Sequence, residues 1–269
     1  MTADRANSGN RNGRLSVAER QDNIALALSR SGYQSIAGLA EMLDVSEMTI
    51  RRDLDALAAR GLVERAHGGA VARWGNRLDI VEPALEERLG RNATAKARIA
   101  GLACDLVGDG QAMALDIGST TLRLAHVLRD KNVRIFTSSL KIAMLLSESR
   151  PRVYMLGGEI RGSEPSLVGP MALGQLETFR FDSFFMGASG LSEDGLYDYS
   201  LEDTEIKRAM MARAARTIAL VDSSKFERLS IVKIADLEQL DMLITDASPE
   251  GALADGLEAA GVEVRVAAP

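Results

Sequence analysis

The chain has 269 residues, of which 46% are apolar and 26% charged, so it is long enough for a small domain and a larger one with buried cores. Its net charge of −6 argues against a uniformly basic nucleic-acid-binding protein. The charge is uneven, because residues 1–72 carry nine basic and nine acidic residues and the whole acidic excess lies in the remainder. A DNA-tolerant first part attached to an acidic body fits this distribution, although a neutral segment is a weak signal for DNA binding.

The first residues and the single cysteine bear on location. Residues 1–13 lack the apolar core of a signal peptide and are predicted to form a disordered tail. No apolar run approaches the ~20 residues that cross a bilayer. Cys104 is the only cysteine, so an intrachain disulfide and a cysteine-rich zinc site are excluded, and a cytoplasmic location is expected.

Residues 14–72 are predicted to form one small domain. Its elements are a helix ending near Gly32, a short helix over 35–44 with Ser35 as a plausible cap, a helix from Ser46 to Gly61, and a hairpin around Gly68–Gly69. Helix, short helix, brief turn and helix is the plan of a helix-turn-helix, and the hairpin supplies a wing. The pattern therefore predicts a winged helix-turn-helix.

The third predicted helix carries two adjacent arginines in its first two turns. Ile50, Leu54 and Leu57 recur at helical spacing and make an apolar face, and Arg52 falls on the opposite face. Arginines on an exposed helix face are often only solvated. In a helix-turn-helix, however, the start of this helix enters the major groove, where Arg bonds guanine O6 and N7 with about 1–3 kcal/mol of discrimination. The context favours DNA reading.

The run VSEMTIRRDLDALAARGLVERAHGGA closely resembles the DNA-binding signature of the DeoR-type family of bacterial repressors of sugar metabolism. TIRRDL, the spaced Gly61, Arg65 and the closing HGGA match in order. Serine and threonine hydroxyls near the helix start suit phosphate contacts. The predicted DNA-binding residues are Ser46, Glu47, Met48, Thr49, Arg51, Arg52, Arg65 and His67.

Residues 73–92 have no clean period and are predicted to be a linker to an effector domain over 93–269. In that domain helical stretches alternate with seven apolar strands, predicted over 112–117, 133–137, 152–156, 182–188, 217–222, 241–246 and 262–266. Alternation with nearly continuous apolar strands predicts an α/β domain with a mostly parallel sheet, covered by helices on both faces.

Polar residues and glycines follow several of these strands, where ligands bind in open α/β sheets. DIGSTT (116–121) places hydroxyls at a helix start and predicts an anion cradle, although such a run is as often only a cap and turn. Lys225 offers a charge for phosphate or stands in water. The acids at the start of EDTEIKR (202–208) favour the helix electrostatically, and Glu205 and Lys207 have a structural role or a ligand role.

The same family shows this pattern, and its effector domain resembles the ribose-phosphate isomerase fold and binds a phosphorylated sugar. The resemblance implies an effector site made of Asp116, Gly118, Ser119, Thr120, Thr121, Thr137, Ser138, Ser139, Gly157, Gly158, Glu205, Lys207, Asp222 and Lys225. Ser138 stands where the family usually has Asn. Because a hydroxyl does not present an amide's paired donor and acceptor, the sugar preference is expected to differ.

We therefore predict a DNA-binding transcriptional regulator, most simply a repressor, of a carbohydrate-metabolism operon. Its partners are operator DNA, a phosphorylated sugar or polyol and further copies of itself in a dimer or tetramer, with no membrane, catalytic residue, metal or cofactor. One alternative is a sugar-phosphate isomerase-like enzyme with a DNA-binding head. A helix-turn-helix fused to a sugar kinase-like domain fits less well, because a helix rather than a further strand follows DIGSTT at once.

Overall fold

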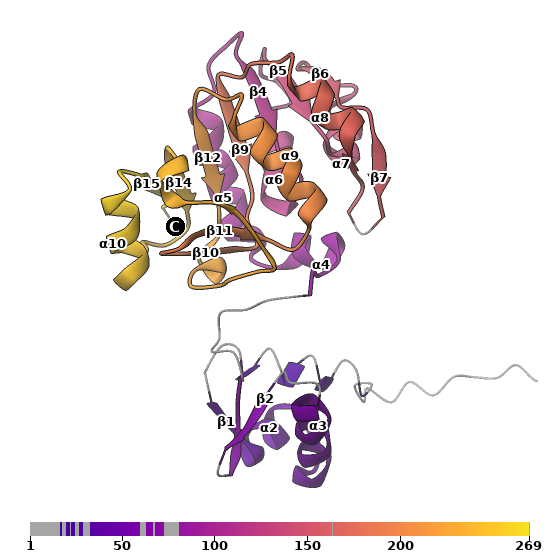
Figure 1. Cartoon of the computed structure of the whole chain (residues 1–269), viewed down its shortest axis with the longest axis vertical. Coiled ribbons are helices and arrows are strands. Elements are labelled where there is room, and N and C mark those ends of the chain that lie inside the picture. Colours follow the sequence, from indigo (N-terminus) through magenta and orange to yellow (C-terminus); the bar gives the residue numbers. More distant parts are fainter. Residues whose placement is uncertain are drawn as a thin grey trace, which may run out of the picture. The chain divides into compact units, whose positions relative to one another are not determined.

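A computed structural model of the chain describes residues 33–59, 63–66, 68–72, 81–162 and 164–268, with single positions between 17 and 28. The chain divides into two compact units, residues 1–77 and 78–269 (Figure 1). The predicted tail, Gly61, His67 and residues 73–80 of the predicted linker lie outside the described residues. Within the described part, no helix has the length and apolar character that crossing a membrane requires.

The first unit contains a helix-turn-helix followed by a hairpin, as predicted. Its elements are β1 (Tyr33–Ser35), α2 (Ile36–Met42), α3 (Glu47–Ala59), β2 (Val63–Ala66) and β3 (Gly69–Ala72). β3 pairs antiparallel with both β1 and β2, and β1 is a strand that was not predicted. Leu39 of α2 and Ile50 and Leu54 of α3 are fully buried, together with Ile24 and Leu28.

Hydroxyl caps begin both helices of this motif. The Ser35 side chain accepts a hydrogen bond from Gly38 N (3.0 Å), and the Ser46 side chain accepts one from Thr49 N (3.2 Å). Each cap satisfies an N–H group that lacks a partner within its helix. Asp44, in the turn between the helices, has φ +50°, which Asp tolerates better than most residues. The local sequence thus sets where α3 begins.

The second unit is built on a seven-stranded sheet in which every pairing is parallel. The strands are β4 (Ala112–Leu115), β5 (Arg134–Thr137), β6 (Arg152–Met155), β9 (Ser183–Met186), β12 (Thr217–Leu220), β14 (Met242–Thr245) and β15 (Glu263–Val266), in the order β15-β14-β12-β9-β4-β5-β6. All seven predicted strands are present, so the predicted parallel α/β sheet is confirmed.

Helices cover both faces of this sheet. The helices of this unit are α4 (Leu85–Gly90), α5 (Ala93–Asp105), α6 (Ser119–Val127), α7 (Leu140–Leu146), α8 (Pro170–Leu176), α9 (Leu201–Met211), α10 (Gly251–Ala259) and the short 3-10 helices η1 (Ser223–Lys225) and η2 (Leu237–Gln239), and α5 to α10 supply the two covering layers. Phe185 packs with α5, α6 and α7, whereas its neighbours Phe184 and Met186 pack with α8, α9 and α10. Alternate strand residues therefore enter separate cores, as expected for a buried parallel sheet.

Five short strands lie outside the main sheet and were not predicted. β7 (Glu159–Arg161) and β8 (Ser166–Val168) form a hairpin, and β10 (Gly190–Ser192), β11 (Gly195–Asp198) and β13 (Val232–Ala235) form a three-stranded antiparallel sheet. The loops after β4, β5, β6, β9 and β12 meet at one edge of the parallel sheet. Helix α4 lies in the stretch predicted as linker, yet it belongs to the second unit. The predicted domain boundaries stay a prediction.

Candidate functional site

The exposed face of α3 carries the predicted DNA-reading residues. Met48 is 60% exposed, and Arg51 and Arg52 are exposed. Arg51 pairs with Glu47 one turn earlier (3.2 Å), and both side chains of that pair are about half exposed. In the part of the chain that the structure describes, no hydrogen bond or ion pair engages the Arg52 side chain. Its guanidinium is therefore available to an outside partner.

Arg65 and the two hydroxyls at the start of α3 make internal contacts. Arg65 Nη1 on β2 donates to Asp55 Oδ1 (3.0 Å) and to Arg51 O (3.3 Å), so it ties the hairpin to α3. The Ser46 and Thr49 hydroxyls lie 2.9 Å apart, and Ser46 also caps the helix. His67 lies outside the described residues. Ser46, Thr49 and Arg65 therefore hold the exposed face of α3 in shape and also form part of it.

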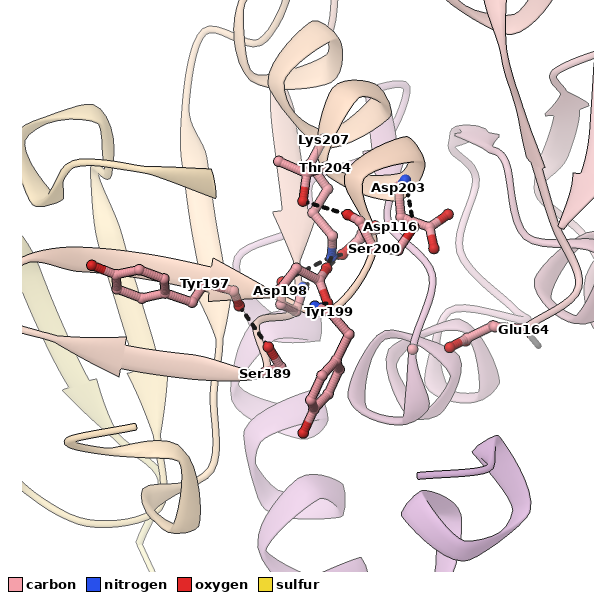
Figure 2. A network of polar contacts seen from close by, with 12 residues as sticks. Asp116, Glu164, Ser189, Tyr197, Asp198, Tyr199, Ser200, Asp203, Thr204 and Lys207 are labelled. Carbon is pink, nitrogen blue, oxygen red and sulfur yellow. Dashed lines mark hydrogen bonds and ion pairs between the residues drawn. The ribbon is translucent and has the colours of Figure 1, made fainter. Parts of the chain in front are cut away.

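At the carboxyl edge of the parallel sheet, one buried ammonium lies between two carboxylates (Figure 2). Lys207 of α9 forms ion pairs with Asp116, which follows β4, and with Asp198 of β11 (3.0 Å). Lys207 Nζ also donates to Gly187 O (3.0 Å), while Gly187 N donates to Asp116 Oδ2 (3.0 Å). Asp116 and Lys207 are only 1% and 2% exposed. Because an unpaired buried charge is strongly destabilising, each charge in this cluster depends on the opposite charge beside it.

The ionisation of this cluster follows from its burial. Burial raises the pKa of Asp116 to about 7; Lys207 opposes that rise and Asp198 adds to it. Burial also lowers the pKa of Lys207, but Asp116 and Asp198 more than offset this and hold it above its ordinary value. Lys207 is therefore charged, and the two carboxylates share one counterion. Carboxylate oxygens in this state accept hydrogen bonds from ligand hydroxyls.

The DIGSTT loop presents the hydroxyls of two largely buried residues, Ser119 and Thr120. Gly118 has φ +126°, which favours glycine, and its carbonyl accepts from Leu122 N and from Thr121 Oγ1 (both 3.0 Å). Ser119 and Thr120 are each 7% exposed, and neither hydroxyl hydrogen-bonds to any described residue. They stand in the first turn of α6, beside backbone N–H groups without helical partners. Hydroxyls and N–H groups placed together in this way can donate hydrogen bonds to an anion.

The predicted TSS turn after β5 is largely engaged in holding its own backbone. Thr137 Oγ1 accepts from Ser139 N (3.0 Å), and the Ser139 hydroxyl caps α7 by accepting from Ile142 N (3.3 Å). Ser138 is 1% exposed and its carbonyl accepts from Leu167 N of β8 (2.8 Å). Among the described residues its hydroxyl has no hydrogen-bond partner. Ser138 is therefore the member of this turn with a free side chain.

The two glycines after β6 allow the β7–β8 hairpin to approach the sheet edge. Gly157 N donates to Gln175 Oε1 of α8 (2.9 Å). Gly158 has φ +153°, and a Cβ there would lie 2.5 Å from Val168 O. Any larger residue at 158 would therefore push β8 away.

Asp222 and Lys225 lie where β12 ends. Asp222 is 3% exposed and accepts from Asn92 Nδ2 (2.8 Å), Ser224 N (3.2 Å) and Ser224 Oγ (2.5 Å). Lys225 is half-buried in η1. Asp222 is thus bonded directly to the residue that precedes α5.

The structure groups the predicted effector residues unevenly. It brings Asp116 and Lys207 into direct contact and puts the DIGSTT loop, the TSS turn, the glycine pair and Asp222–Lys225 at one edge of the sheet. Glu205 is exposed, and within the described residues nothing connects it to this cluster. No group of three His, Cys, Asp or Glu side chains in the described part is arranged to hold a metal ion.

Sequence reasoning missed the residues that reach the site from the stretch predicted as linker. Residues 82–92 are tied to the second unit by several side chains and carbonyls. The pairs are Glu82–Arg161 (3.0 Å), Glu86–Lys141 (2.6 Å), Arg88–Glu164, Arg88 O with Lys96 Nζ (2.6 Å), Leu89 O with Arg123 Nη2 (3.1 Å) and Asn92–Asp222 (2.8 Å).

These ties reach the buried cluster through Arg161. Its Nε lies 2.6 Å from Asp203 Oδ2 of α9, and Asp203 Oδ1 accepts from Ser166 Oγ of β8 (2.8 Å). Asp203 lies one helical turn before Lys207 (Figure 2). Asp198 was missed for another reason, because it comes from a hairpin strand that was not predicted.

Comparison with known families matches both units. Residues 20–73 match the DeoR-like helix-turn-helix domain, and residues 91–247 match the DeoR C terminal sensor domain. The transcriptional regulator GlpR of Haloferax volcanii is 35% identical over 92% of this chain and 96% of its own length. The glycerol-3-phosphate regulon repressor of Escherichia coli K12 is 32% identical over 87% of this chain and 93% of its own length. These relatives are named as regulators and not as enzymes.

A structural comparison gives more distant matches. Ribose 5-phosphate isomerase A from Methanocaldococcus jannaschii matches with a TM-score of 0.38 and 22% sequence identity, over 50% of this chain and 55% of that one. So distant a likeness says nothing about chemistry. The architecture is given by the strand order above.

Proposed function

Since the chain belongs to the DeoR family of transcriptional regulators, we propose that it represses a carbohydrate-metabolism operon under the control of a phosphorylated sugar or polyol. The family resemblance seen in the two sequence motifs is confirmed by the matches to both domains. We assign DNA reading to residues 14–72 and effector binding to residues 93–269, with residues 73–92 as the linker between the two domains. We also propose that the protein is cytoplasmic.

The observation that carries the DNA half is the exposed Arg52 on α3. An arginine in the first two turns of a recognition helix reaches guanine edges in the major groove. Arg52 has no internal partner among the described residues, whereas Arg51 and Arg65 have carboxylate partners on the same face. We assign base reading chiefly to Arg52. Ser46, Glu47, Met48, Thr49, Arg51, Arg65 and His67 complete the proposed face.

The effector half is supported by the two free hydroxyls of the DIGSTT loop and the buried acidic cluster nearby. Ser119 and Thr120, together with the N–H groups at the start of α6, suit a phosphate. Asp116 and Lys207 suit sugar hydroxyls. A relative of this chain is named a glycerol-3-phosphate regulon repressor, which is consistent with a small phosphate ester as effector. No cofactor or catalytic residue enters this proposal.

Control of DNA binding requires a path from the sheet edge to the linker. An effector switches a regulator only if it binds one arrangement better than another. Residues 82–92, the last part of the stretch predicted as linker, are bonded to Arg161, to Lys96 and to the proposed effector residue Asp222. We propose that effector binding acts on this segment and releases the DNA.

We also propose that the working form is a homo-oligomer, a dimer or a tetramer. One recognition helix contacts only a few base pairs, and a genome contains too many chance matches to so short a site. Two or more heads on one assembly lengthen the site that is read.

The test uses genomic fragments enriched on the full-length protein and then footprinted. We expect Arg52→Ala to abolish specific protection while melting at the native temperature. Arg152→Ala, which removes an exposed arginine from β6 of the second unit, should protect as the native protein does. Footprints unchanged by Arg52→Ala overturn the assigned face. If no compound in a panel of phosphorylated sugars and polyols shifts either the melting temperature or the DNA affinity, the effector half is wrong.

A further inference from the structure

The charges at the sheet edge fall into two groups of opposite balance. Around Lys207 there are two carboxylates and one ammonium, from Asp116, Asp198 and Lys207 itself. Around Asp222 the balance is reversed. A ligand with an anionic end and a hydroxyl-bearing end therefore meets a different environment at each of them.

Lys96 is the centre of the basic group. It lies in the first turn of α5, on the same face as the buried Ile99 and Ala100, and it is 4% exposed. Its ammonium donates a hydrogen bond to Arg88 O (2.6 Å), and this is its only hydrogen bond to a described residue. An ammonium has three donors, so two remain for another partner. Leaving them unsatisfied in a buried place is costly.

The charged groups that act on Lys96 are mostly cations. Asp222 attracts its ammonium, whereas Lys225, Arg88 and Arg123 repel it. Burial first, and then these cations, lower the pKa of Lys96 to about 8, although Asp222 opposes the change. Arg88 is neutralised by Glu164 and Glu82, but no carboxylate in the described residues pairs with Lys96 or Arg123.

Arg123 strengthens this imbalance. Its Nη2 donates to Leu89 O (3.1 Å), a carbonyl that carries no charge, and its Nε is buried without a partner among the described residues. The positive charge in this region therefore exceeds the single carboxylate of Asp222. A phosphate monoester, with a charge of about −1.5 to −2 near neutral pH, would correct the excess.

The basic group also lies next to the proposed phosphate loop. Helices α5 and α6 pack against each other, and both begin at the carboxyl edge of the sheet (Figure 1). Asn92, which precedes α5, bonds Asp222 and Ser224 at that edge. Ser119 and Thr120 begin α6 there, and their hydroxyls bond to no residue that the structure describes. Lys96 thus comes from one helix and the hydroxyls from its neighbour.

We propose that Lys96 binds the phosphate of the effector, an inference that rests on the proposed effector function. The phosphate would then lie between α5 and α6. The ligand would be oriented with its hydroxyls toward Asp116 and Lys207. Phosphate binding favours the charged ammonium. Near pH 8, where Lys96 is about half protonated in the free protein, binding takes up roughly half a proton. Because Lys96 also holds Arg88 O, the same contact connects the phosphate to α4.

The experiment measures the affinity of the full-length protein for ribose 5-phosphate, fructose 6-phosphate, glycerol 3-phosphate and inorganic phosphate by calorimetric titration at pH 8. Buffers with different ionisation heats report the proton uptake. The variants are Lys96→Met, Lys96→Arg and the matched control Lys131→Met, whose lysine also donates to a backbone carbonyl (Val107 O, 3.3 Å), away from the site.

We expect Lys96→Met to lower the affinity for the tightest-binding phosphate ester by at least about tenfold. Lys96→Arg should retain most of that affinity but take up no proton on binding. Lys131→Met should bind the ester as the native protein does. Affinity of Lys96→Met within twofold of native overturns this inference and leaves the proposed function intact. A native protein that binds none of the compounds overturns both. If Lys96→Met does not fold, proton uptake decides, because a native protein that takes up no proton contradicts the assignment.

Discussion

Arg161 of β7 holds Glu82 with two nitrogens, Nη1 and Nη2, each 3.0 Å from Oε2. Glu82 lies in the stretch predicted as linker, and Arg161 also pairs with Asp203, one turn before the buried Lys207. Glu82 is therefore connected in two steps, through Arg161 and Asp203, to the helix that carries the proposed effector residue Lys207. The side chains of Arg161 and Glu82 are 16% and 17% exposed, so solvent screens this pair only in part.

The first prediction concerns this connection. Glu82→Gln keeps the shape of the side chain but removes its charge, so it should loosen the segment without destroying the site. We expect effector affinity within about twofold of native, while the ratio of DNA affinities without and with effector falls by about fivefold or more, within the usual range of allosteric coupling. Fluorescence anisotropy of labelled operator DNA, with and without effector, gives this ratio.

Glu86→Gln is the matched control for that variant. Glu86 lies in the same segment and pairs with Lys141 (2.6 Å), but its side chain is 75% exposed, and such a pair contributes little. Its coupling ratio should equal the native one. Equal ratios for Glu82→Gln and the native protein would show that the effector signal does not pass through Arg161.

The second prediction concerns the buried ammonium. Lys207→Met leaves Asp116 and Asp198 without their counterion, and breaking a buried pair in this way costs about 3–5 kcal/mol. For a unit of this size the melting temperature should fall by roughly 10 °C. Calorimetry of the second unit's transition measures it. Adding Asp116→Asn to Lys207→Met should recover part of the lost stability. If Lys207→Met alone melts within 2 °C of the native protein, the buried ion pair is refuted.

Most of the seven main strands were predictable because they are short runs of apolar residues between polar ends, such as AMAL in β4 and TIAL in β12. The hairpin strands were not. β7 is the polar EIR and β10 is only GLS, and their pairing depends on glycines and neighbouring loops rather than on a local pattern. Tertiary context decides such segments.

The same distinction explains the site. Hydroxyls and glycines that follow strands were recognised from the sequence, because the edge of a parallel sheet collects them. Asp198 lies on a strand that was not recognised. Lys96 left a usable signal, since its spacing to Ile99, Ala100 and Ala103 puts it on the buried face of α5. A lysine at a buried helical position indicates a partner that the sequence alone does not name.

The third prediction tests the approach of the hairpin to the sheet edge. At Gly158 an added Cβ meets Val168 O at 2.5 Å, and φ is +153°, so Gly158→Ala must move β8 or strain the backbone. We expect a loss of about 1–3 kcal/mol in the stability of the second unit. Gly174→Ala is the control, because Gly174 lies in α8 with nothing near its Cβ position. Helix propensity predicts a gain of up to about 1 kcal/mol there. Losses of the same size in both variants would contradict the close approach.

The last prediction is the pH dependence of stability that Lys96 confers. The pKa of Lys96 is lowered to about 8 in the folded chain from its ordinary value of 10.5, chiefly by burial. Between these values the unfolded chain binds more protons than the folded one, so the contribution of Lys96 to the free energy of unfolding rises with pH. Well below pH 8 Lys96 is protonated in both states, and the cost of the buried charge no longer changes with pH.

Urea unfolding of the native protein and Lys96→Met at pH 7.5, 9 and 10 measures this contribution, because other titrating groups cancel in the difference between the two. The native-minus-variant difference should rise across this range by on the order of 2 kcal/mol. Saturating phosphate should reduce the rise, since a bound anion keeps Lys96 charged. A difference that stays flat from pH 7.5 to 10 would mean that the ammonium keeps its ordinary pKa in the folded chain, and that the excess of positive charge around it is already neutralised.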